Sequence, residues 1–267
     1  MNLGAVQAMS AATDEEIALQ MRYLRAQINA LDAQRELMQI NASYMDVLGR
    51  SLSKTAEDVL MDIGPGIPEH QMGLSGVSRL GLEISKLAKN NDVEMLVRAN
   101  EVRNQCATCH TEANPPGGVD WDHIFRSDWN HTVLHCNTQA RSPYLCRSMN
   151  GMLSAYGTLL TAYEAEIENF EMVEYSATEI VRILKDLKAK NFRHLPENLR
   201  MKAEKDAADL LQLAVDRNPD AFQKAPGITA ACTQCHAQAA SGGGWTSPAS
   251  MMRSLTTAST PVSAWLK

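Results

Sequence analysis

The pentapeptide Cys-x-x-Cys-His occurs twice in this 267-residue chain, and it constrains the fold more than any other feature. The two copies contain Cys106, Cys109 and His110, and Cys232, Cys235 and His236. Two thiols three residues apart can both form thioethers to the vinyl groups of a porphyrin, and the adjoining imidazole then reaches one face of the iron. The sequence therefore predicts two c-type haems, each held by two cysteines and by one proximal histidine.

Two other uses of paired cysteines fit this sequence less well. A zinc site built from both pairs would leave the trailing histidines unexplained. A thioredoxin-like centre needs a strand-helix context, whereas residues 102–105 and 228–231, which precede the two pairs, are compatible with a helix. Covalent haem attachment is the interpretation that uses all six residues.

An internal repeat accompanies the two motifs. The motifs lie 232 − 106 = 126 residues apart, and apolar residues at alternating steps of four and three precede each of them. These residues match at an offset of 128: Met21 with Met149, Leu24 with Met152, Ile28 with Tyr156, and Leu31 with Leu159. The offsets agree to within two residues, so the sequence indicates a duplication.

The pattern predicts an all-α fold of two tandem up-down four-helix bundles, each carrying one covalent c-type haem. The helices are expected at about 14–49, 53–63, 74–89 and 92–112, then at about 146–171, 175–191, 197–217 and 219–238. Thr13 to Glu16 and Ser176 to Glu179 have the sequence of a capping box. We expect four segments: a first bundle (1–114), a linker with an inserted segment (115–146), a second bundle (147–240) and a Gly, Ser and Thr-rich tail (241–267).

Charge and hydropathy exclude several partners. A net charge of −6 disfavours nucleic acid and anionic membranes, and no apolar run approaches the ~20 residues that a transmembrane helix needs. Residues 1–20 lack the pattern of a signal peptide, although c-type haem is normally attached outside the cytoplasm. We therefore expect a periplasmic or otherwise exported protein whose signal has been removed. In an oxidising compartment Cys136 and Cys146 would form a disulfide, and two buried thiols are the alternative.

A four-helix unit with Cys-x-x-Cys-His near the end of its last helix resembles the cytochrome c prime family, including its low-spin relatives with a methionine ligand. The resemblance covers each half separately, although that family usually carries one haem and lacks the segment from Trp121 to Cys146. It implies that the first helix supplies whatever faces the distal side of the iron. By position this points to Met21 in the first half and to Met149 or Met152 in the second, with packing as the alternative role.

Histidines form a rival set of distal ligands. His70 and His194 precede their haem cysteines by 106 − 70 = 36 and 232 − 194 = 38 residues, in the expected connection between the second and third helices. That connection also lies at the haem end of an up-down bundle, so bis-histidine ligation and a surface position are both open. Two further pairs deserve attention, namely His131 with His135 as ligands, and Arg22 with Arg147 as partners of haem propionates.

The function predicted from these features is single-electron transfer between redox partner proteins by an exported dihaem cytochrome. Binding or sensing of NO or CO at a five-coordinate haem is the alternative, and a dihaem peroxidase fits the long helices less well. An electron carrier need not be an enzyme. The chain could also form a homo-oligomer or a subunit of a larger redox complex.

Overall fold

A computed structural model describes residues 13–37, 39–64, 68–112, 136, 142–190, 196–224, 227–228, 230–231 and 234. The regular structure of these residues is helical, which confirms the all-α class. The helices are α1 (Asp14–Glu36), α2 (Ala42–Ile63), α3 (Pro68–Lys89), α4 (Glu94–Glu112), α6 (Pro143–Glu164), α7 (Phe170–Ala189) and α8 (Glu197–Val215). A further helical run begins at Asp220.

The helix order repeats at the spacing expected from the sequence. From the first half to the second, the helix starts shift by 143 − 14 = 129, 170 − 42 = 128 and 197 − 68 = 129 residues. The run that begins at Asp220 lies 220 − 94 = 126 residues after the start of α4. Each half therefore presents its helices in the same order.

The first break in each half differs from the expected one. The predicted helices 14–49 and 146–171 are wrong because asparagine caps start a new helix earlier: Asn41 Oδ1 accepts from Tyr44 N at 3.1 Å, and Asn169 Oδ1 accepts from Met172 N at 3.0 Å. The cap at Thr13 is confirmed as a capping box with Glu16. The cap predicted at Ser176 is wrong, since that residue lies buried inside α7.

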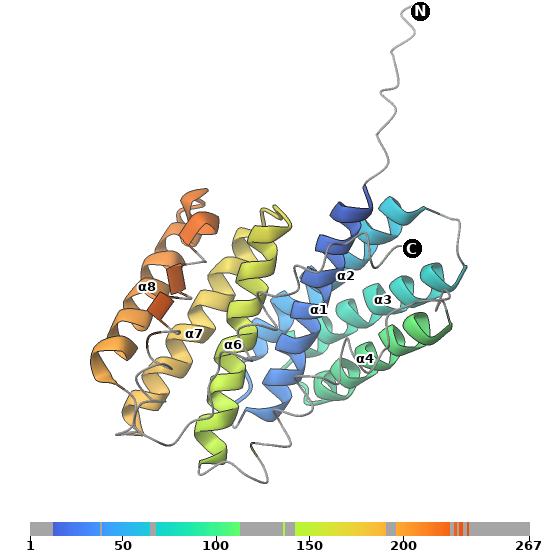
Figure 1. Cartoon of the computed structure of the whole chain (residues 1–267). Coiled ribbons are helices and arrows are strands. Elements are labelled where there is room, and N and C mark those ends of the chain that lie inside the picture. The colour runs from blue at the N-terminus through green and yellow to red at the C-terminus, as the bar shows by residue number, and fades with distance from the viewer. Residues whose placement is uncertain are drawn as a thin grey trace, which may run out of the picture.

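Neighbouring helices pack in a continuous array (Figure 1). In the first half α1, α2, α3 and α4 form a closed ring of contacts, because α4 also touches α1. In the second half α6 packs on α7, and α7 on α8. The halves meet where α1 packs on α6 and α2 on α7, so one hydrophobic core runs through both predicted bundles. Its largest fully buried side chains include Tyr23, Tyr44, Leu48, Leu52 and Met172.

Two hydrogen bonds across this junction are related by the repeat. Asn41 Nδ2 donates to Glu179 Oε2 at 2.9 Å, and Asn169 Nδ2 donates to Ser51 Oγ at 3.1 Å. The donors differ by 169 − 41 = 128 residues and the acceptors by 179 − 51 = 128. Reciprocal contacts of this kind are the signature of an isologous, two-fold interface. The halves therefore join like the subunits of a pseudo-symmetric dimer.

The inserted segment is tied to the second half by a disulfide. Cys136 and Cys146 are bonded, with their Cα atoms 5.4 Å apart, as the sequence predicted. Asn150 on α6 donates from Nδ2 to Cys136 Sγ at 3.2 Å. Cys146 itself lies on α6, which begins at Pro143, four residues before the predicted start of the second bundle. Within the described residues, none of the helices is long and apolar enough to span a membrane.

Candidate functional site

The first Cys-x-x-Cys-His motif lies on the last turns of α4. Cys106 is 8% exposed and belongs to the main core, on the same face of the helix as the buried residues Ala99 and Val102. The backbone of Cys109 and His110 continues α4, whereas their side chains lie outside the described residues. The helix therefore directs at least the first thiol of the motif into the bundle.

The second motif, Cys232, Cys235 and His236, lies outside the described residues. The residues just before it are described: Ile228 is 2% exposed and Ala231 is fully buried, and both join the main core. They hold the positions that Val102 and Gln105 hold before the first motif, at the offset of 126 residues. The approach to the second motif is thus also packed against the core.

Four helix ends meet around the first motif. Gln20 near the start of α1 donates to Asp62 near the end of α2, with 2.8 Å between Nε2 and Oδ2. A Cβ added to Gly76 near the start of α3 would lie 2.7 Å from Gln105 on α4, so these two helices touch closely there. The up-down order therefore brings the start of α1, the end of α2 and the start of α3 to the end of the ring that carries the motif (Figure 1).

His70 lies at this end, but not in a loop. The predicted position in a connection is wrong, because α3 begins at Pro68 and His70 occupies its first turn. Its side chain is partly buried, and the buried Nδ1 atom has no hydrogen-bond partner. Buried ring nitrogens normally have a partner, so this atom marks a place where a bound group could supply one. The other histidines considered, His131, His135 and His194, lie outside the described residues.

The methionines proposed as distal ligands pack against apolar side chains. Met21 is partly buried against the main core. Met149 and Met152 both contact a small cluster of Leu145, Ile183 and Leu187, and Met152 also contacts the main core. These contacts give all three thioethers a packing role. Whether any of them ligates iron stays a prediction.

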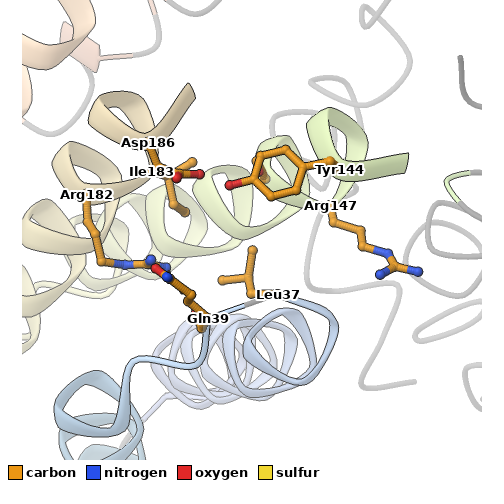
Figure 2. Close-up of a pocket in the computed structure, with 8 residues that line it drawn as sticks. Leu37, Gln39, Tyr144, Arg147, Arg182, Ile183 and Asp186 are labelled. Carbon is orange, nitrogen blue, oxygen red and sulfur yellow. Dashed lines mark hydrogen bonds between the residues drawn. The ribbon is translucent and has the colours of Figure 1, made fainter. Parts of the chain in front are cut away.

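The two arginines proposed as propionate partners lie in different surroundings. Arg22 is close enough to Glu164 to lower its pKa, against the burial that raises the pKa of that carboxyl overall. Arg22 thus faces the junction of α1 with α6. Arg147 lines a pocket between the start of α6 and the end of α7, and in Figure 2 its guanidinium points away from the ring of Tyr144.

That pocket encloses about 20 Å³, which is room for about one water molecule. A larger, open cleft of about 490 Å³ lies at the other end of α7, where Glu168, Glu171 and Glu174 line it together with Arg217. Cys106 and His70 line neither of these two pockets. Among the described residues no group of three or more His, Cys, Asp or Glu side chains is arranged to hold a metal ion.

Arg200 is a candidate that the sequence analysis missed. It lies on the first turn of α8, one repeat (129 residues) after Gln71, the neighbour of His70, and only 6% of it is exposed. Its Nη1 atom binds Glu204 at 2.9 Å, whereas Nη2 makes no hydrogen bond and lies 3.9 Å from Glu197. A buried guanidinium with an unused nitrogen can bind a further carboxylate, such as a haem propionate. The acidic residues three before and four after it were the available signal.

Comparison of the chain with protein-family models, with curated proteins and with solved structures finds no match. The chemistry of this chain therefore has to be argued from its own residues.

Proposed function

We propose that the chain is an exported dihaem c-type cytochrome that transfers single electrons between redox proteins. The observation that carries the proposal is the duplicated Cys-x-x-Cys-His motif, in which each copy stands at the same place in a repeated set of helices. Chance occurrence of one pentapeptide is plausible, but a chance match in register with a structural repeat is not.

The residues around the first motif fit such a group. Cys106 is buried on the inner side of α4, where its thiol can be joined to a flat apolar ring. The unpartnered Nδ1 atom of His70 lies at the same end of the four helices. Each bound haem would supply a one-electron iron couple, with His110 or His236 as the proximal ligand. In the second half, Arg200 offers a buried cation to a propionate.

The protein part has three tasks in this proposal. The helical core excludes water from the iron, which together with the ligands sets the reduction potential. The net charge of −6 favours encounter with a basic patch on a partner. Met61 and Met72, which are 72% and 62% exposed near the end of α2 and the start of α3, offer apolar, adaptable side chains for a weak and transient contact.

The remaining features agree with this role. The likeness to cytochrome c prime proteins, with one four-helix bundle around each haem, is part of the proposal. Export to the periplasm or a comparable compartment accounts for both haem attachment and the Cys136–Cys146 disulfide. Assembly with itself or within a larger redox complex is compatible with transfer of single electrons.

A redox titration followed by exposure to CO tests the function. The electron carrier predicts two reversible one-electron steps and optical spectra that CO does not change. A haem that binds CO when reduced would count against a carrier with both irons closed and would support gas binding. Rapid turnover of peroxide, measured with a reduced cytochrome as donor, would support the peroxidase alternative instead.

A further inference from the structure

The end of α3 that carries His70 is unusual because it buries a polar atom without pairing it. His70 Nδ1 is shielded from solvent and makes no hydrogen bond, although its side chain is only partly buried. Leaving a buried donor or acceptor without a partner costs about 1–3 kcal/mol. An imidazole is kept in such a position more easily if a bound group completes it.

The packing of α3 on α4 sets His70 level with the haem motif. Gly76 lies against Gln105, and Arg98 lies 3.5 Å from Glu83, so residues of the two antiparallel helices pair with a sum near 181. Moving six residues back from Gly76 reaches position 70, and moving six forward from Gln105 reaches position 111. Since each residue advances an α-helix by about 1.5 Å, His70 stands within one turn of His110.

Met21, the competing ligand, stands further along the bundle. Asp32 on α1 lies 3.6 Å from Arg103 on α4, which fixes the register of these two helices. Seven residues beyond Arg103 is His110, and seven residues before Asp32 is position 25, so Met21 lies about one helical turn past the motif. Its side chain already packs against the core. Position and packing therefore favour His70 over Met21.

We propose that His70 is the second axial ligand of the first haem, on the face opposite His110. This inference rests on the proposed function. It makes the first iron six-coordinate with two imidazole ligands, which closes it to CO and suits electron transfer. It also gives the imidazole of His70 the partner that the protein alone does not provide.

The experiment compares the visible and EPR spectra of the purified dihaem protein with those of His70→Ala. The expected result is loss of the low-spin signal of one of the two haems, with CO binding at that haem after reduction and an unchanged count of two haems. Added imidazole should restore the low-spin spectrum, because it can occupy the open position. Met21→Leu is the matched control and should leave the spectrum as it is.

Several outcomes would overturn the inference. A His70→Ala protein with two unchanged low-spin haems would show that His70 is not a ligand, as would loss of the low-spin signal in Met21→Leu instead. If the alanine variant does not fold, as judged by circular dichroism, His70→Gln provides the same test with a side chain of closer size. A wild-type protein without covalent haem would overturn the proposed function as well, so the two failures can be told apart.

Discussion

Glu179 Oε1 accepts a hydrogen bond from Gln34 Nε2 at 2.7 Å, across the junction between the two halves of the chain. The carboxylate is fully buried, and its second oxygen accepts from Asn41 Nδ2 at 2.9 Å. Arg182, one turn further along α7, donates to both oxygens at 2.7 and 2.8 Å. A charge this well paired can be buried, and it ties α1 and α2 to α7.

Replacing Glu179 by alanine should destabilise the whole array. The substitution leaves the buried amides of Gln34 and Asn41 and the Arg182 guanidinium without their acceptor, and we expect a loss of about 3 kcal/mol in the free energy of unfolding. Urea unfolding followed by circular dichroism measures it. Glu174→Ala, on the same helix but with a partly exposed side chain, should change stability by less than about 0.5 kcal/mol. Equal effects of the two substitutions would contradict the assigned role of Glu179.

A second link between the halves should depend on pH. Arg50 on α2 donates to Glu171 on α7 at 2.6 and 2.8 Å, and this lowers the pKa of Glu171 below its ordinary value of 4.5. A carboxyl with a depressed pKa contributes stability above pH 4.5 and loses it as the pH falls through the folded-state value. Because the Glu171 side chain is 45% exposed, we expect a contribution below about 1 kcal/mol.

The comparison of wild type with Glu171→Gln at pH 7 and at pH 3 tests this. At pH 7 the wild type should be the more stable protein, and at pH 3 the difference should largely vanish, because Glu171 is then protonated. A difference of the same size at both pH values would exclude the ion pair as its origin.

The contact of α2 with α3 should not tolerate a side chain at Gly49. A Cβ there would lie 2.5 Å from the carbonyl oxygen of Gly81 and 2.8 Å from Ser85 N, and backbone atoms cannot move aside as a flexible side chain can. Gly49→Ala should therefore cost about 1–3 kcal/mol. Gly227→Ala is the control, since a Cβ at Gly227 meets nothing within 4 Å. Thermal unfolding that is equally affected by both changes would argue against this close helix crossing.

The sequence predicted the helix type and the repeat well, because the periodic apolar residues and the Thr13 cap are local signals. It placed the first break near residue 50, where the structure has a continuous α2, because the asparagine cap at Asn41 was not recognised. The junction of the halves could not be predicted, since it depends on pairs such as Gln34 with Glu179 that lie 145 residues apart. The position of His70 depended on the same missed helix start, at Pro68.

The two iron sites should titrate independently. α4, which carries the first motif, packs on α3 and α1, whereas α8 packs on α7 at the other edge of the array (Figure 1). With neighbouring helix axes about 8–10 Å apart, several helices separate the two haems that we propose. A redox titration of the wild type should equal the sum of two single-haem variants, Cys106→Ala/Cys109→Ala and Cys232→Ala/Cys235→Ala. A shift in the potential of the remaining haem of more than about 60 mV, tenfold in a one-electron equilibrium, would contradict independence.

The most direct test of the central claim is the number of covalent haems in the protein produced in a host that attaches c-type haem. Intact mass under denaturing conditions, together with the pyridine haemochrome spectrum, should give two haems per chain for the wild type. Each double cysteine variant should retain one haem. A wild-type chain with the mass of the bare polypeptide, in a host that matures a control cytochrome normally, would contradict the account.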